Sequence, residues 1–407
     1  MDPIPTNDIA LSKDGQYVAA VGPAFSSVLA FYSRSGEIPI WTYIVADVFS
    51  SVAISADGSC VAAGNSSHVL FWNNAKSRTP GDTYPTWTSV DLGGPIGYRC
   101  LAISDNGNYV VAGGTGTNVY YWANAKSSDP SPVSPTWTSG LPGLVEAVDM
   151  SSDGNYVAAG YDTDVAYWKN ARSLGPGSVS PAWSSTYPDD QIMDVAVSDD
   201  GNYVAAAGKF GVSPVYYWAN AKSLSDNPTT TWESASGVDF SSIDMSSDGD
   251  RVIAGALGPP GDQGVYFWSG ARARSGTQPW SWNYTTAGGV CDVAINDAGD
   301  YMAAANSIAV PHCVYFFDSS GNSLWNPPYQ VDNPVRSLSI SSDGGTLAIG
   351  TGAITSRLLV STGYRTTRPV GGLLLPVDKL ALLSPWIAVA LAAVALTVFA
   401  TKRRREL

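Results

Sequence analysis

The sequence has few of the residue types that catalytic and metal-binding sites require. Charged residues make up 14% of the 407 positions, and there are only two His and four Cys. So few ligands argue against a zinc framework or a dense disulfide scaffold. A net charge of -13 argues against nucleic acid as a partner, because phosphate binding requires clustered Lys and Arg. No Gly-x-Ser-x-Gly, phosphate-loop or His-Glu-x-x-His motif occurs, so we predict no enzymatic activity, cofactor or metal.

What the sequence does contain is repetition, carried by 41 Gly, 26 Pro and 14 Trp. A phrase of alternating apolar residues, Ser, Asp or Asn, Gly and a Val/Ala run recurs eight times, for example as SSDGNYVAAG. The Gly after Asp or Asn predicts a hairpin turn, because Gly adopts positive φ without a steric cost. These glycines recur every 43 to 50 residues, at Gly15, Gly58, Gly107, Gly154, Gly201, Gly249, Gly299 and Gly344.

Each repeat also carries two tryptophan positions. A Val-x-aromatic-Trp strand ends at Trp72, Trp122, Trp168, Trp218 and Trp268, and a second series follows at Trp41, Trp87, Trp137, Trp183, Trp232, Trp282 and Trp325. Four short strands then fill one period, which is the size of a propeller blade. We expect most Trp side chains to pack between blades, because large aromatics dominate core burial, and fewer to serve as sugar-stacking platforms.

The Asp-Gly turn, the Val-Ala-Ala-Gly run and the Val-x-x-Trp strand are similar to those of WD-repeat and quinoprotein-like β-propellers, especially prokaryotic surface representatives. The resemblance covers residues 8 to about 360 and implies an all-β, eight-bladed propeller over residues 1–363, with seven blades as the alternative. The chain departs from eukaryotic WD repeats in lacking their Gly-His pair. The eighth unit lacks a Trp-marked fourth strand, which either residues 364–374 or a segment upstream of Met1 would supply.

The C-terminal region predicts a membrane anchor. Leu380 to Ala400, with Trp386 inside, contains no charged residue, and 21 helical residues at about 1.5 Å each span the hydrocarbon core. Lys402, Arg403, Arg404 and Arg405 follow directly. Because positive charge stays cytoplasmic, we expect a linker at 364–379, a single span at 380–400, a cytoplasmic tail at 401–407 and an extracellular propeller at the cell membrane. The first residues resemble no signal peptide, so this topology requires an export signal upstream of Met1.

Isolated side chains allow a few further predictions. Cys60 with Cys100, and Cys291 with Cys313, are possible disulfides, although four cysteines allow three connectivities. Asn65 and Asn283 begin glycosylation sequons. We interpret the Asp residues of the repeated turns as turn formers, since each lacks the additional oxygen donors of a calcium loop. His68 and His312 have no ligand partners at metal-binding spacing.

Three functional hypotheses remain at this point. The first is a non-enzymatic membrane-anchored surface propeller that binds a protein or glycan through loops such as 77–85 and 127–135. The second is a surface enzyme, either a quinone-dependent oxidoreductase, as the resemblance to quinoproteins implies, or a hydrolase that uses channel carboxylates such as Asp189-Asp190 or Asp199-Asp200. The third is a cytosolic, tail-anchored WD-repeat-like scaffold. Propellers host many activities, so the fold alone does not choose among them.

Overall fold

The computed structural model describes residues 7–22, 27–36, 38–114, 116–128, 132–209, 215–235, 237–258, 262–306, 311–352 and 359–362. The predicted linker, membrane span and tail, including Leu380, Trp386, Ala400, Lys402, Arg403, Arg404 and Arg405, lie outside these residues. Within the described ranges, no helix is long and apolar enough to cross a bilayer. All the regular structure there consists of β-strands and five single-turn 3-10 helices.

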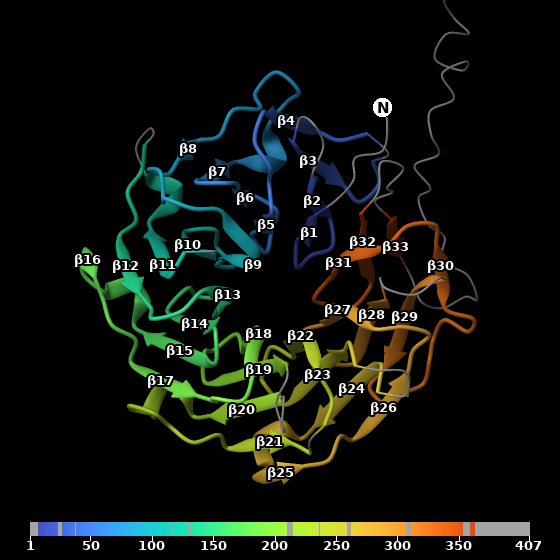
Figure 1. Ribbon diagram of the computed structural model, residues 1–407. Coiled ribbons are helices and arrows are strands. Elements are labelled where there is room, and N and C mark those ends of the chain that lie inside the picture. Colours follow the sequence, from blue (N-terminus) through green and yellow to red (C-terminus); the bar gives the residue numbers. More distant parts are fainter. Residues whose placement is uncertain are drawn as a thin grey trace, which may run out of the picture.

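The described strands form eight sheets arranged in a ring around a central axis (Figure 1). We number them by their innermost strands. Sheet 1 contains β1 (Asp8–Leu11), β2 (Tyr17–Gly22), β3 (Ser27–Ser33) and β4 (Trp41–Val45). Sheet 2 contains β5 (Ser51–Ile54), β6 (Cys60–Gly64), β7 (Val69–Asn73) and β8 (Trp87–Thr88). Sheet 3 contains β9 (Ile96–Ile103), β10 (Tyr109–Gly114), β11 (Asn118–Ala123) and β12 (Trp137–Gly140), with β16 (Gly177–Ser178) at its edge.

The remaining sheets follow the same antiparallel order from the axis outward. Sheet 4 contains β13 (Val145–Met150), β14 (Tyr156–Tyr161), β15 (Asp164–Lys169) and β17 (Trp183–Thr186). Sheet 5 contains β18 (Gln191–Val197), β19 (Tyr203–Lys209), β20 (Val215–Ala219) and β21 (Trp232–Ser234), with β25 (Gly276–Gln278) at its edge. Sheet 6 contains β22 (Phe240–Met245), β23 (Arg251–Ala256), β24 (Gly264–Ser269) and β26 (Trp282–Thr285). Sheet 7 contains β27 (Val290–Ile295), β28 (Tyr301–Asn306), β29 (His312–Asp318) and β30 (Tyr329–Val331). Sheet 8 has three described strands, β31 (Val335–Ile340), β32 (Thr346–Thr351) and β33 (Leu359–Thr362).

The repeated Asp-Gly turn has the structure that its sequence predicts. Asp153 Oδ1 accepts hydrogen bonds from Ser151 Oγ (2.7 Å) and from the backbone N–H of Asn155 (2.9 Å). Gly154 has a φ of +74°, and a Cβ built there would lie 2.6 Å from the Tyr109 ring of the preceding sheet. Gly is therefore required both for the turn and for the approach of the neighbouring sheet. The Asp serves the turn, as we interpreted it.

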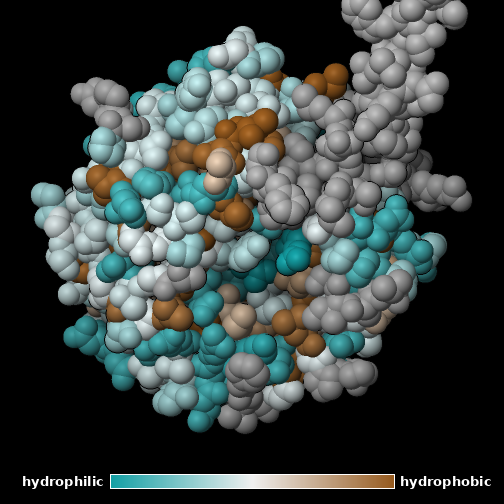
Figure 2. Space-filling view, turned by 45° about the horizontal axis from the view of Figure 1, so that its top comes forward, coloured by the Kyte–Doolittle hydropathy of each residue, from teal (hydrophilic) through white to brown (hydrophobic). Residues whose placement is uncertain are grey.

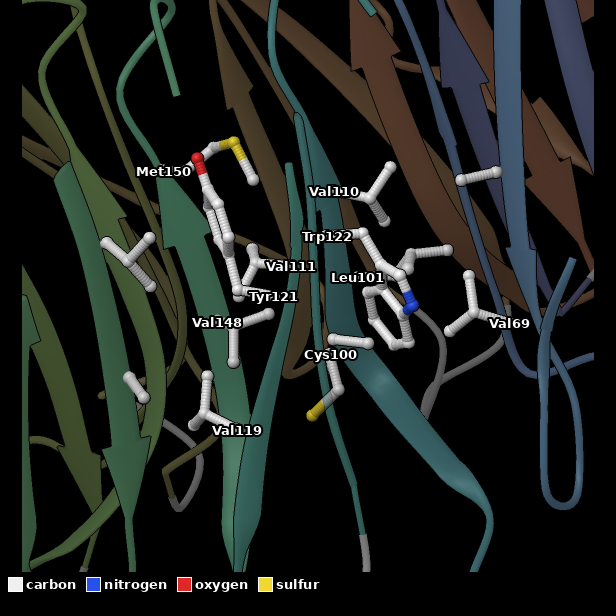
Figure 3. Packing of buried hydrophobic residues seen from close by; sticks show 14 of the residues in the cluster. Val69, Cys100, Leu101, Val110, Val111, Val119, Tyr121, Trp122, Val148 and Met150 are labelled. Carbon is white, nitrogen blue, oxygen red and sulfur yellow. The ribbon is translucent and has the colours of Figure 1, made fainter. Parts of the chain in front are cut away.

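Aromatic side chains fill the space between the sheets (Figure 3). Tyr121 and Trp122 are neighbours on β11 and project to opposite faces of sheet 3. Trp137 stacks on Tyr121 with 4.9 Å between ring centroids, and its indole N–H donates to the carbonyl of Ala171 in sheet 4 (2.9 Å). The same bond recurs around the ring at Trp41, Trp87, Trp183 and Trp232, all fully buried. These Trp side chains therefore hold adjacent sheets together, and their burial makes them unavailable as sugar-stacking platforms.

The 3-10 helices account for the recurring Asn-Ala-Lys/Arg-Ser phrase. They are η1 (Ala75–Ser77), η2 (Ala125–Ser127), η3 (Ala171–Ser173), η4 (Ala221–Ser223) and η5 (Ala271–Ala273). Each is preceded by Asn or Gly in the left-handed conformation, with φ between 55° and 67°. Asn tolerates this conformation better than other residues that carry a Cβ. The buried Ala that follows presents its carbonyl to the Trp of the preceding sheet.

The first and eighth sheets are joined directly. The backbone N–H of Leu11 donates to Ser339 Oγ (3.1 Å), and Ser337 Oγ donates to Asp8 Oδ1 (2.9 Å). The N–H of Ser342 donates to the carbonyl of Lys13 (2.8 Å), as the N–H of Ser152 does to Asp199 between sheets 4 and 5. The predicted fourth strand of the last unit, whether from residues 364–374 or from upstream of Met1, lies outside the described residues.

Several of the loops between the two Trp strands, where we predicted partner binding, cover the edges of neighbouring sheets. Val133, in the 127–135 loop, exchanges backbone hydrogen bonds with Thr88 and Val90 beyond the outer strand of sheet 2. The corresponding loops of the fourth and sixth repeats supply β16 and β25, which pair in parallel with β12 and β21. An unpaired strand edge invites aggregation, and this pairing removes the hazard. The 77–85 loop remains more open, with Tyr84 75% exposed.

Candidate functional site: the central channel

The innermost strands β1, β5, β9, β13, β18, β22, β27 and β31 surround the axis of the ring (Figure 1). A cavity of about 620 Å³ lies at the end of the channel where these strands begin. Its wall includes Asn7 to Ile9, Gly97 to Arg99, Leu144 to Glu146, Met193, Asp194, Ser242 to Asp244, Cys291 to Val293 and Val335 to Leu338. We call it the mouth cavity. In Figure 2, hydrophilic residues gather around the centre of this face.

Two exposed apolar side chains accompany the polar wall of the mouth cavity. Tyr98 is 52% exposed and Leu144 is 47% exposed. They belong to the segments that enter sheets 3 and 4, which are neighbours in the ring. An exposed aromatic and an exposed aliphatic side chain thus lie beside the polar cavity, and aromatic residues are enriched in binding hot spots.

Five aspartates of the inner strands link the sheets that carry them, sheets 1, 4, 5, 6 and 7, to the sheet that follows. One carboxylate oxygen of each accepts a backbone N–H from the following inner strand. The pairs are Asp8 with Val52, Asp149 with Val197, Asp194 with Ile243, Asp244 with Ile295 and Asp292 with Leu338, at 2.6 to 3.0 Å. The aspartates thus satisfy N–H groups that face the channel, where no further strand is available to accept them.

Confinement in the channel changes the acidity of these groups. Burial raises the pKa of Asp149 to about 7 and that of Asp194 to about 6, although backbone hydrogen bonds, and Arg99 in the case of Asp194, oppose the change. Burial also raises the pKa of Asp8, Asp244 and Asp292. Removing a carboxylate from water disfavours its ionised form, and neighbouring carboxylates disfavour it further.

Arg99 crosses the channel from sheet 3. Its guanidinium donates to the carbonyls of Ser241 (2.5 Å) and Cys291 (2.6 Å) and to Asp292 Oδ1 (3.0 Å), and it lies 3.6 Å from Asp194 Oδ2. Burial lowers the pKa of Arg99, but the carboxylates of Asp194 and Asp292 outweigh this and raise it. The guanidinium is therefore charged and neutralises part of the acidic wall.

A second cation occupies the opposite end, among the hairpin turns. Lys13 Nζ lies 3.0 Å from Asp105 Oδ2 and 3.0 Å from Asp199 Oδ1. Burial lowers the pKa of Lys13, but Asp199, Asp105 and Asp297 together raise it above its usual value. The same turn position is occupied by Lys13 in the first repeat and by Asp105, Asp199 and Asp297 in the third, fifth and seventh repeats. The even-numbered repeats carry Ala or Ser at this position. Arg99 and Lys13 thus place a paired cation near each end of the channel.

The predicted cysteine couples are not brought together. All four cysteines are described, and none of them forms a disulfide in the structure. Cys60 lies against the turn at Gly107, whereas Cys100 Sγ is directed to the carbonyl of Val145 in sheet 4. In sheet 7, Cys291 Sγ contacts Val335 O, and Cys313 Sγ contacts Pro311 O. In neither couple, therefore, do the two cysteines lie in the same space between adjacent sheets.

The two sequons have different environments. Asn65 is 5% exposed, and its Oδ1 accepts the backbone N–H groups of Ser67 and His68. Asn283 is exposed on the outer strand β26. Of the two, Asn283 is therefore the residue that offers its amide to solvent, and its glycosylation remains a prediction.

The remaining polar candidates are separated from one another. His68 and His312 belong to sheets 2 and 7, and no group of metal-ligating side chains assembles in the described part of the chain. Asp190 accepts a hydrogen bond from the Tyr216 hydroxyl, and Asp199 is paired with Lys13. The carboxylates that do surround the axis could have been recognised from the inner-strand phrase, which begins with Asp in the first, fifth and seventh repeats.

Comparisons with known proteins identify the fold. No protein-family model and no curated protein matches the sequence. The structure is similar to that of the C-terminal WD40 domain of Sif2, with a TM-score of 0.64 and 13% identity over 89% of this chain and 97% of that domain. The chain therefore has a WD40-like β-propeller fold. Because 1766 chains of solved structures match it, the likeness shows the fold and leaves the function to be argued from the site.

Proposed function

We propose that the chain is a non-enzymatic, membrane-anchored cell-surface protein whose eight-bladed propeller binds a protein or glycan partner at the mouth cavity. The observation that carries the proposal is the exposure of Tyr98 and Leu144 beside a cavity of about 620 Å³. We place the contact surface at the axis of the ring, because several perimeter loops already pair with sheet edges. A rigid ring that presents an aromatic and an aliphatic group beside polar ones suits recognition of a partner.

Separate observations support the other parts of the proposal. Eight described sheets, with direct bonds between the first and the eighth, support a ring of eight blades. The uncharged segment 380–400 and the basic residues after it support a single span with a cytoplasmic C-terminus. The resemblance to prokaryotic surface propellers agrees with this topology.

The inward carboxylates favour a second candidate, a hydrolase with a channel active site. Raised pKa values are typical of catalytic acids. Asp149 and Asp194, however, each use both carboxylate oxygens to accept backbone N–H groups. This arrangement explains their presence structurally, so we place the hydrolase second to the binding protein.

Cross-linking from the rim of the mouth cavity tests the proposed function. We expect a photoreactive benzoylphenylalanine placed at Tyr98 to form a discrete adduct on cells, and Leu144→Ser to reduce its yield about tenfold. That reduction corresponds to the loss of about 1.4 kcal/mol of binding free energy, within the usual range for a hot-spot contact. The same group at Tyr84, which is more exposed than Tyr98 but lies on the perimeter, is the control. Equal adducts at both positions, or none at Tyr98, would contradict the proposal.

A further inference from the structure

A β-bulge recurs at the start of the inner strand in sheets 4 to 8. In sheet 4 the pairing of β13 with β14 passes over Glu146, and in sheet 8 the pairing of β31 with β32 passes over Arg336. A bulge leaves one residue out of the ladder and redirects its side chain. Glu146 and Arg336 both border the mouth cavity, as does Met193 at the bulge of sheet 5. The bulges therefore decide which side chains a ligand in the cavity meets.

Most charged groups of the cavity wall are already used within the protein. The guanidinium of Arg99 is bound by oxygens of sheets 5, 6 and 7. Four carboxylates accept hydrogen bonds at both oxygens, those of Asp8, Asp194, Asp244 and Asp292. The charged residues of the wall that remain are Glu146 and Arg336.

These two side chains are available to a ligand. Glu146 is partly exposed and accepts one long hydrogen bond, from the side-chain amide of Gln191 (3.3 Å). Arg336 is exposed, and within the described ranges it forms no hydrogen bond or ion pair. Neither charge is compensated by the other, because they belong to different sides of the ring. The wall thus offers one carboxylate and one guanidinium.

The two available charges face the cavity from opposite sides. Each inner strand contacts the next around the ring, so that sheets 4 and 8 are four places apart in either direction. In Figure 1, β13 and β31 accordingly lie on opposite sides of the axis. A carboxylate binds an ammonium group, and a guanidinium binds a carboxylate through paired hydrogen bonds. One ligand satisfies both sides only if it carries opposite charges at its two ends.

The wall between the two charges contains apolar groups. Tyr98, Leu144 and Met193 all border the cavity, and the first two are among the most exposed large apolar side chains of the described chain. A cavity of about 620 Å³ has the size of a small-ligand site. A short peptide has charged ends and an apolar middle, and each extended residue adds about 3.3–3.6 Å to its length.

We propose that the mouth cavity binds a free short peptide, whose N-terminal ammonium pairs with Glu146 and whose C-terminal carboxylate pairs with Arg336. Apolar side chains of the peptide contact Tyr98, Leu144 and Met193. The inference goes beyond the proposed function, because it assigns a small ligand and requires no partner on the cell. A purified chain and a synthetic peptide test it, so either proposal can fail while the other stands.

Calorimetric titration of the full chain with synthetic peptides of two to five residues, built from alanine and leucine, tests the site. We expect at least one length to bind saturably. Acetylating the N-terminus of that peptide, or amidating its C-terminus, should weaken binding at least tenfold, because each change removes one charge-assisted contact.

Two substitutions assign the ends of the peptide. Glu146→Gln should abolish the preference for a free N-terminus and keep the preference for a free C-terminus, and Arg336→Gln should do the reverse. Arg336→Lys keeps the positive charge, so it should retain a preference for the free carboxylate. The exposed Asp226→Asn is the control and should leave both preferences unchanged.

Three results would overturn the inference. The first is that no peptide of these lengths binds the wild-type chain saturably. The second is that the blocked peptides bind as tightly as the free one, a result that requires no variant and therefore decides even if a substitution prevents folding. The third is that folded Glu146→Gln and Arg336→Gln chains, verified by circular dichroism, keep both preferences.

Discussion

Replacing Trp137 with alanine should lower the free energy of unfolding by about 3–5 kcal/mol, the usual cost of truncating a fully buried large aromatic side chain. The indole lies between sheets 3 and 4, stacked on Tyr121 and 6.0 Å from Trp168, and donates to Ala171. Alanine would leave a cavity there and an unsatisfied carbonyl. Denaturant titration followed by circular dichroism measures the change.

Two further variants separate the contributions of Trp137. Trp137→Phe keeps a ring in the stack but removes the indole N–H, so it should cost less than Trp137→Ala. Tyr84→Ala removes an aromatic side chain that is 75% exposed, and it should change stability by less than about 0.5 kcal/mol. A loss for Trp137→Ala no greater than that for Tyr84→Ala would show that the Trp series does not hold the sheets together.

The second large effect is a dependence of stability on pH. The carboxyl group of Asp149 has a pKa of about 7 in the folded chain. In the unfolded chain its pKa is about 4, the ordinary value for an aspartate. Between these values the folded state binds more protons, so stability is highest near the lower value and falls as the pH rises through 7. Since the Asp149 residue is only partly buried, we expect a loss of about 2 kcal/mol between pH 5 and pH 8, smaller than the full shift implies.

Asp149→Asn should reduce this dependence by the share that Asp149 contributes, because an amide is neutral throughout the range and its oxygen still accepts one backbone N–H, while Asp8, Asp194, Asp244 and Asp292 keep their own raised pKa values. The exposed Asp226→Asn is the matched control and should leave the pH profile unchanged. Denaturation midpoints measured at pH 5, 6, 7 and 8 decide the matter. A wild-type chain that becomes more stable towards pH 8, or an Asp149→Asn profile identical to that of the wild type, would contradict the buried-carboxylate account.

The sequence predicted the repeating parts of the fold because they are set by local chemistry. The Ser-x-Asp-Gly turn requires its hydroxyl, carboxylate and positive φ wherever it occurs, and Asp153 with Gly154 shows the predicted arrangement. The two Trp positions recur because each fills the same inter-sheet space. Local pattern was therefore sufficient for the WD40-like propeller.

The site was harder to predict because it depends on side chains that meet only when the ring closes. Arg99 is 192 residues from Cys291, and no spacing rule relates them. The loop at 127–135 looked free because its partner, the edge of sheet 2, belongs to another repeat. The cysteine couples were judged by proximity in sequence, whereas side chains in one repeat point into different inter-sheet spaces. Non-repeating residues at the axis are thus where the sequence was least informative.

The most direct test of the central claim, a surface propeller held by a C-terminal span, is labelling of intact cells with a membrane-impermeant maleimide. Tyr84→Cys places an exposed thiol on the propeller, and the unsubstituted chain gives the background from its own cysteines, of which Cys60, Cys100 and Cys313 are buried. Leu407→Cys places a thiol in the predicted cytoplasmic tail. We predict that position 84 is labelled equally in intact and lysed cells, and position 407 only after lysis. Labelling of position 84 only after lysis would contradict the account and favour a cytosolic, tail-anchored scaffold.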